Sequence, residues 1–150
     1  MTVRQNLLFP LRRHWSKERI LAEANEAVRE ALEDVGLSHT LHMMPAELSG
    51  GMRKRIALAR TIILKPKVIL YDEPTTGLDP ITSREISELI LSIQAKYQTA
   101  AIIISHDLSS IKLTANRIIM LIEGRNYAEG TFDQFTELQD SRVREFFEGL

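Results

Sequence analysis

Two adjacent carboxylates, Asp72 and Glu73, follow a short apolar run, Val68-Ile69-Leu70-Tyr71, and precede Pro74. The run is too short for a helix and is typical of a fully buried strand. Carboxylates at the carboxyl end of such a strand lie where α/β sheets place their ligands. Because successive side chains at a strand end point in different directions, one acid can hold a metal ion while the other acts on a water molecule. We assign Asp72 to the metal and Glu73 to the water.

A pair of glycines lies upstream, in Ser49-Gly50-Gly51, at the start of a helical pattern. The backbone N–H groups of a helix N-terminus point outward and can bind phosphate. The basic run Arg53-Lys54-Arg55 adds positive charge to this end. The pattern places four apolar residues on one face of the helix: Ile56, Ala59, Ile62 and Ile63. Asp72 and Glu73 by themselves would indicate only a strand that leads into an acidic turn. Together with the two glycines, they favour a phosphate site.

Three motifs carry a resemblance to the ATP-binding-cassette (ABC) ATPases: Leu48-Ser49-Gly50-Gly51-Met52, Asp72-Glu73-Pro74-Thr75-Thr76-Gly77-Leu78-Asp79, and Ser105-His106-Asp107. The first resembles the family signature, the second its Walker B acids and D-loop, and the third its switch histidine. The resemblance covers essentially the whole chain. It implies catalytic roles for Glu73 and His106, a Mg²⁺ ligand in Asp72, and contacts to ATP from Ser49, Gly50, Gly51 and Asp79.

The sequence departs from the family pattern in two places. Met52 stands where the signature usually ends in Gln. Together with the run from Asp72 to Thr82, this resembles the Mla/Mkl branch that powers lipid transport. The family's phosphate-binding pattern, G-x-x-x-x-G-K-[ST], does not occur in the 150 residues. We therefore expect an ATPase active only as part of a complete domain, and no meaningful ATPase activity from this chain alone.

The alternation of strands and helices predicts an α/β fold, which the resemblance makes a P-loop NTPase-like, mainly parallel and incomplete sheet. Residues 1–64 would form an α-helical subdomain carrying the signature, and residues 65–150 the Walker B, D-loop and switch-histidine core. The sequence of residues 1–15 predicts a loop or short helical turns. Ser16 should cap a long helix that ends at Gly36.

Further elements are expected downstream of the D-loop. Thr82 or Ser83 should open a helix, and residues 100–104 should form a second buried strand that ends at His106. A short helix at 108–115, a strand at 117–122 and a returning strand at 127–129 should follow. The tail at 131–150 predicts short helices whose inward side chains are Phe132, Phe135, Leu138, Val143, Phe146 and Phe147.

The family's sheet order places the P-loop strand between the strands at 100–104 and 117–122. Without it, two strand edges would be unpaired, and bare edges recruit other strands. We expect the chain alone to close this gap by direct pairing of the two strands, by strand exchange between copies, or by aggregation.

Composition limits the partners of the chain. The 19 basic and 20 acidic residues nearly cancel, so bulk charge does not indicate nucleic acid or an anionic membrane. No apolar run reaches the roughly 20 residues that span a bilayer. The resemblance implies transmembrane permease subunits, a second ATPase subunit in a head-to-tail homodimer, and a cytoplasmic location on the inner face of the membrane.

Two other functions stay open. The chain could be a non-enzymatic module that docks to a membrane partner, although the intact Asp72, Glu73, Ser49 and His106 argue against this. It could also belong to a DNA-repair or chromosome-maintenance ATPase, but its Pro74-Thr75-Thr76-Gly77-Leu78-Asp79 run resembles a transporter and no coiled-coil heptads flank the motifs. We favour the ATP-binding and ATP-hydrolysing subunit of a transporter for phospholipid or another lipid.

Overall fold

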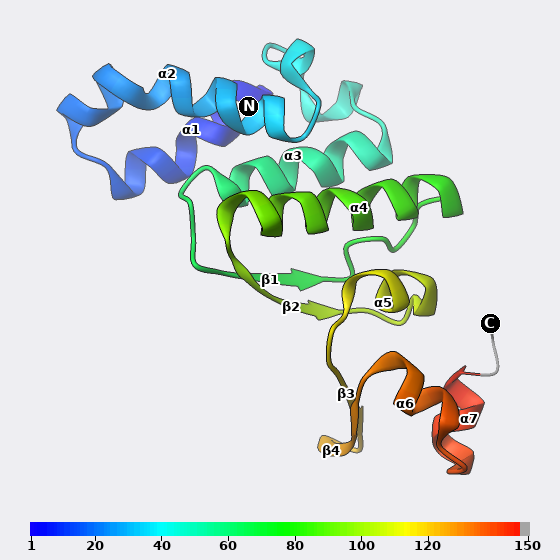
Figure 1. Ribbon diagram of the computed structural model, residues 1–150. Helices are drawn as coiled ribbons and strands as arrows, with labels where there is room; N and C mark the ends of the chain where they lie inside the picture. Colours follow the sequence, from blue (N-terminus) through cyan, green and yellow to red (C-terminus); the bar gives the residue numbers. More distant parts are fainter. Residues whose placement is uncertain (148–150) are drawn as a thin grey trace.

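The computed structural model describes residues 1–147, which form helices and two small sheets (Figure 1). The α-helices are α1 (Val3–His14), α2 (Lys17–Asp34), α3 (Gly50–Ile62), α4 (Pro80–Tyr97), α5 (Leu108–Thr114), α6 (Phe132–Glu137) and α7 (Ser141–Phe147). The strands are β1 (Val68–Asp72), β2 (Ala100–Ile104), β3 (Ile118–Ile122) and β4 (Arg125–Gly130). The predicted α/β class is confirmed, and residues 148–150 of the predicted tail lie outside the described residues.

The chain runs from a helical end to an end that carries a hairpin (Figure 1). Helices α1, α2 and α3 pack against one another, and α4 packs along α3. One continuous apolar core joins these four helices to β1. The proposed division of the chain near residue 64 stays a prediction.

Residues 1–15 do not form the loop or short turns that Pro10 suggested, because α1 is a single helix of 12 residues. Thr2 and Gln5 form a capping box at its start. A proline inside a helix costs about 3 kcal/mol. Here a stripe of buried side chains offsets that cost: Val3, Leu7, Leu8 and Leu11. Burial of these side chains in the core therefore outweighs the helix-breaking effect of Pro10.

Helix α2 begins after the Ser16 cap and ends just before Gly36, as predicted. Helix α4 starts earlier than predicted, because its cap is Asp79 and not Thr82 or Ser83. The Asp79 carboxylate accepts hydrogen bonds from the N–H groups of Ile81 and Thr82, at 3.1 and 3.0 Å. Pro80 then occupies the first helical position, where its missing N–H costs nothing.

Strands β1 and β2 pair in parallel, with Asp72 opposite Ile104 at their carboxyl ends. The prediction that both strands are fully buried is wrong. Ile69 lies in the core, but alternate side chains point away from it, with Leu70 73% and Ile104 62% exposed. The reason is that, within residues 1–147, helices cover only one face of this pair.

Strands β3 and β4 form a separate antiparallel hairpin. The two turn residues, Glu123 and Gly124, both have positive φ, as a tight hairpin turn requires. Strand β4 starts two residues before the predicted position 127. Strands β2 and β3 do not pair with each other in the described chain. The prediction that they close the gap by direct pairing is therefore wrong.

The tail forms the two short helices that were expected, α6 and α7. Phe132, Phe135 and Val143 are buried, as predicted. Leu138 and Phe146 are exposed, contrary to prediction, because Leu138 caps the end of α6 and the short α7 has only one buried face.

Candidate functional site

The parallel pairing of β1 and β2 brings their carboxyl ends to one edge of the sheet. The N–H of Glu73 donates to the carbonyl of Ile104 at 2.9 Å, which extends the pairing by one residue. Two residues further on, His106 Nδ1 lies 2.8 Å from Glu73 Oε1. An ionised carboxylate has no proton to give, so the imidazole is the donor. Two side chains that are 33 positions apart thus form one hydrogen-bonded unit.

Glu73 has a left-handed backbone, with φ at 48°. This conformation costs a non-glycine residue about 1–3 kcal/mol, and such residues cluster at functional sites. Hydrogen bonds to both its N–H and its carbonyl maintain this strained conformation. Its N–H is bonded to Ile104, and its carbonyl accepts a 2.8 Å hydrogen bond from Lys54 Nζ of α3.

Thr76 and Thr75 support the pair, although neither was among the site residues predicted from the sequence. The Thr76 hydroxyl donates to Glu73 Oε2 at 2.7 Å. Thr75 is buried and donates to Asp107 Oδ2 at 3.1 Å, while Asp107 Oδ1 caps α5 directly after His106. The two threonines in the turn after the acids were the available signal, because hydroxyls in turns bond to nearby acceptors.

Hydrogen bonding shifts the protonation of both members of the pair. The hydrogen bond from His106, followed by that from Thr76, lowers the pKa of Glu73 below its ordinary value. The hydrogen bond to Glu73 and its charge raise the pKa of His106. Both shifts favour a carboxylate beside an imidazolium.

Asp72 ends β1 with an exposed side chain. Within residues 1–147, its carboxylate has no hydrogen-bond or ion-pair partner. Mg²⁺ prefers oxygen ligands and is often held by one or two carboxylates together with water and phosphate oxygens. The carboxylate therefore fits a Mg²⁺ ion, which it would hold with ligands from outside the described residues.

The predicted phosphate-binding helix start is formed by α3. Ser49 is its cap and accepts a hydrogen bond from the N–H of Met52 at 3.2 Å. The glycines also have a packing role. A Cβ on Gly51 would lie 2.7 Å from Thr82 Cγ2 of α4, and a Cβ on Gly50 would lie 3.4 Å from Leu78. Close approach of α3 to the D-loop and α4 thus requires glycine at position 51.

The three basic residues after the glycines are engaged within the chain. Arg53 donates to the carbonyl of Leu48 at 2.6 Å, and Arg55 pairs with Glu85 at 2.8 Å. Lys54 bonds to the carbonyl of Glu73, as described above. The prediction that these residues place positive charge at the start of the helix is therefore only partly confirmed. Their side chains bind neighbouring elements of the same chain.

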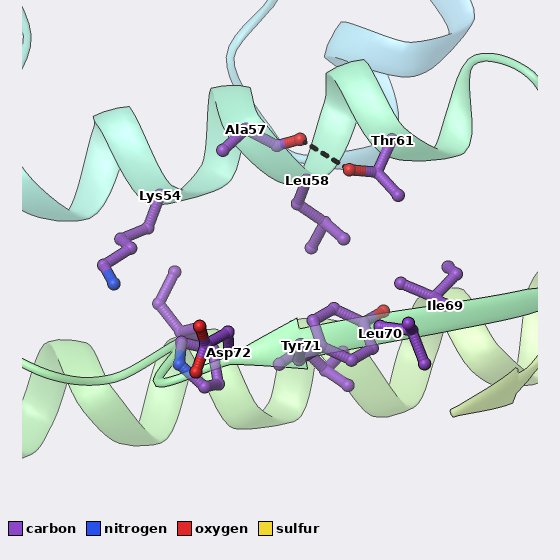
Figure 2. Close-up of a pocket in the computed structure, with 11 residues that line it drawn as sticks. Lys54, Ala57, Leu58, Thr61, Ile69, Leu70, Tyr71 and Asp72 are labelled. Atoms are coloured by element: carbon purple, nitrogen blue, oxygen red, sulfur yellow. Dashed lines mark hydrogen bonds between the residues drawn. The ribbon is translucent and has the colours of Figure 1, made fainter. Parts of the chain in front are cut away.

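A cavity of about 230 Å³ lies between α3, β1 and α4, and Figure 2 shows the side chains that line it. Most of its lining is apolar, and Leu58 of α3 points across it toward the strand. Lys54 extends from α3 toward the end of the strand, where Asp72 lies. The cavity thus adjoins the strand-end carboxylates.

The proposed site residues fall into two groups. Glu73 and His106 form the first, at the sheet edge that also carries Asp72. The second is made by the signature and D-loop residues: Ser49, Gly50, Gly51 and Asp79. Within residues 1–147, no hydrogen bond joins the signature residues to Glu73 or His106.

The parallel strands with acids at their carboxyl ends, and the helices on one face, define an α/β protein of the P-loop NTPase-like kind. A family model described as ABC transporter matches residues 1–76, which is half of the chain. The chain belongs to the ABC transporter family.

Curated relatives agree with the motifs. The chain is 39% identical over 144 residues to the intermembrane phospholipid transport system ATP-binding protein MlaF of Haemophilus influenzae, covering 96% of this chain and 54% of that protein. It is 35% identical over 149 residues to the probable ribonucleotide transport ATP-binding protein mkl of Mycobacterium leprae, covering 99% and 42%. The placement beside the Mla/Mkl branch is confirmed, and the chain spans about half the length of these relatives.

The fold agrees as well. The structure of cbiO1 from Clostridium perfringens, described as part of the ABC transporter complex cbiONQ, superposes with a TM-score of 0.81 at 29% identity. The match covers 98% of this chain and 61% of that one. None of the helices in residues 1–147 has the length and apolar character needed to cross a membrane.

Proposed function

We propose that this chain forms part of the ATP-hydrolysing subunit of an ABC transporter. The observation that carries the proposal is the 2.8 Å contact between His106 and Glu73 at the carboxyl edge of the parallel strands. An acid and a histidine held together at this edge suit the activation of a water molecule beside a phosphate.

Glu73 is the proposed general base. The contacts from His106 and Thr76 occupy one position on each carboxylate oxygen, and an ionised carboxylate has about four such positions in all. Glu73 can therefore accept a proton from water while it stays oriented. His106 would respond to the terminal phosphate with the ring nitrogen that does not face Glu73.

Asp72 is the proposed Mg²⁺ ligand. When bound, Mg²⁺ neutralises the charge that develops on the phosphate oxygens. Asp72 and Glu73 then have separate roles, because only Glu73 is tied to the histidine. Ser49, Gly50, Gly51 and Asp79 are proposed to contact ATP across a head-to-tail dimer, which agrees with the lack of hydrogen bonds from the signature residues to Glu73 within residues 1–147.

The proposed partners are permease subunits, to which the chain would bind from the cytoplasmic side. The relatives are named for transport, which favours this function over DNA repair. Their names differ in substrate, one giving phospholipid and the other ribonucleotide. We propose phospholipid or another lipid, because the relative with the higher identity of the two is the phospholipid protein.

The chain by itself should bind Mg-ATP only weakly and should not hydrolyse it at a meaningful rate. The reason is that a G-x-x-x-x-G-K-[ST] loop is absent from its sequence, so the main cradle for the β- and γ-phosphates is not present. Calorimetric titration of the 150-residue chain with Mg-ATP measures this. Micromolar affinity would show that the nucleotide site is misplaced.

In a completed domain, in which a segment with the G-x-x-x-x-G-K-[ST] pattern precedes this chain, Glu73→Gln should keep ATP binding and lower turnover by about 10²-fold or more. The amide keeps the shape of the side chain but loses its basicity. The matched control is Glu137→Gln, an exposed residue of α6 outside the site.

Normal turnover in Glu73→Gln would contradict the general-base role. A completed wild-type domain that binds ATP and never hydrolyses it would instead support the non-enzymatic docking module. Asp72→Asn should weaken the dependence of turnover on Mg²⁺, which separates the roles of the two acids.

A further inference from the structure

Lys54 differs from the two basic residues that flank it. Arg53 bonds to a carbonyl five positions away at the start of its own helix, and Arg55 pairs with a carboxylate. Lys54 instead reaches the carbonyl of Glu73, 19 positions along the chain, at 2.8 Å. Within residues 1–147, no carboxylate lies within ion-pair distance of its ammonium. The half-buried ammonium is therefore satisfied by one peptide group in particular.

That peptide group belongs to the residue with the strained backbone. The N–H of Glu73 is fixed by the carbonyl of Ile104, which restrains φ at its value of 48°. The carbonyl of Glu73 accepts a hydrogen bond from Lys54 at 2.8 Å and a longer one from the N–H of Thr76 at 3.4 Å, and the shorter bond from Lys54 is the stronger restraint on ψ. With both dihedral angles set, the direction in which the side chain leaves the backbone is also set. That direction is the one that reaches His106.

We propose that Lys54 is a positioning residue for Glu73, through which the helix that carries the signature glycines holds the water-activating carboxylate at the sheet edge. The water-activating role itself rests on the proposed function. The positioning role does not, because it concerns the backbone of Glu73 in the chain alone. A simple anchoring role for Lys54 would tie α3 to the strand and leave the geometry of Glu73 to other contacts.

Amide hydrogen exchange of the 150-residue chain, resolved by segment with mass spectrometry, separates these roles. Lys54→Met keeps the aliphatic chain and removes the donor. It should speed exchange in the segment 72–79, where the amides of Glu73 and Thr76 are bonded, and leave α3 nearly unchanged. Lys54→Arg keeps a donor, and the adjacent cavity gives room for the larger group, so it should restore slow exchange. The control is Lys17→Met, an exposed lysine at the start of α2.

Faster exchange in α3 with an unchanged segment 72–79 would overturn the proposal in favour of anchoring. Equal loss of protection in Lys54→Met and Lys54→Arg would also overturn it. If Lys54→Met loses protection throughout, the Lys54→Arg result decides alone: wild-type exchange in 72–79 supports the proposal and faster exchange there rejects it.

Turnover supplies a second readout in a completed domain. Small misplacements of a catalytic group can cost about 10²-fold in rate, so Lys54→Met should lower kcat by up to about that factor with little change in KM. Lys54→Arg should recover most of the loss. A completed wild-type domain without ATPase activity would reject the proposed function, whereas the exchange result would still decide whether Lys54 positions Glu73.

Discussion

At the scale of single residues, the pair formed by Glu73 and His106 is the feature on which the proposed chemistry depends. Its members come from the ends of two adjacent parallel strands, and Thr76 and Lys54 hold Glu73 from its side chain and its backbone. The arrangement keeps a carboxylate ionised and directed while its backbone is strained. Such strain persists only where surrounding contacts enforce it.

The pair should depend on pH in a defined window. The pKa of His106 is raised from its ordinary 6.5, so its contribution to stability is present below 6.5 and is lost as the pH rises through the raised value. The pKa of Glu73 is lowered from 4.5, so its contribution is present above 4.5 and is lost as the pH falls through the lowered value. The ion pair is therefore complete between the two shifted values.

Glu73→Gln should return the pKa of His106 toward 6.5, because the amide cannot stabilise the imidazolium as the carboxylate does. The pH dependence of exchange at the imidazole C2 hydrogen, followed by mass spectrometry, gives this pKa in the 150-residue chain. Glu137→Gln is the control and should leave it unchanged. A pKa that is equal in wild type and Glu73→Gln would show that the contact does not persist in solution.

At the scale of elements, the start of α3 lies against the start of α4. A Cβ on Gly50 would meet Leu78 and one on Gly51 would meet Thr82, so the signature lies close to the D-loop and to the start of α4 within the chain. Gly51 therefore has a structural reason to be glycine besides any contact with phosphate. A Gly51→Asp substitution would disturb this packing and could not by itself test a role across a dimer.

Gly51→Ala should destabilise the chain by about 1–3 kcal/mol, the usual range for overpacking. Its Cβ would lie 2.7 Å from Thr82 Cγ2. In the Thr82→Ser background that methyl group is gone, while the hydroxyl that donates to Asp79 at 2.6 Å is kept. The same Gly51→Ala change should then cost much less. Urea unfolding of the four proteins gives the coupling free energy.

Gly50→Ala is the matched control, since its Cβ would lie at an ordinary 3.4 Å from Leu78. Equal costs for Gly51→Ala in the two backgrounds would show that Thr82 does not set the requirement for glycine.

At the scale of the whole molecule, the described chain leaves one face of the β1–β2 pair open. Val68, Leu70, Ile102 and Ile104 are exposed on it, and the two sheets are not joined by hydrogen bonds. Exposed apolar faces and unpaired strand edges favour association. With direct pairing of β2 and β3 ruled out for this chain, strand exchange and aggregation are the expectations that remain.

The purified 150-residue chain should therefore self-associate in a concentration-dependent way. The double variant Leu70→Thr, Ile104→Thr should reduce this, because threonine keeps β propensity while removing apolar surface. Leu21→Thr is the control, since Leu21 is 86% exposed on α2, away from the sheet. Light scattering over a range of concentrations measures the effect. A wild-type chain that stays monomeric throughout would contradict the prediction.

The sequence by itself determined the local features of this protein. The Ser16 cap and the apolar face of α3 are predicted correctly because hydrogen bonds within a helix or a cap join residues at most a few positions apart. The order of motifs also sufficed to place the chain in its family. The assignments of Asp72, Glu73, Ser49 and His106 to chemical roles stay predictions.

Tertiary structure decided what depends on distant residues. Pro10 lies inside a helix because the stripe of buried side chains on α1 outweighs a local breaker. Strands β1 and β2 were predicted to be fully buried, but every second side chain is exposed because helices cover only one face of the pair. The bond from Lys54 to Glu73 and the contact of Glu73 with His106 join residues 19 and 33 positions apart. Such contacts are set by how helices and strands pack, and no local pattern of residue types encodes that packing.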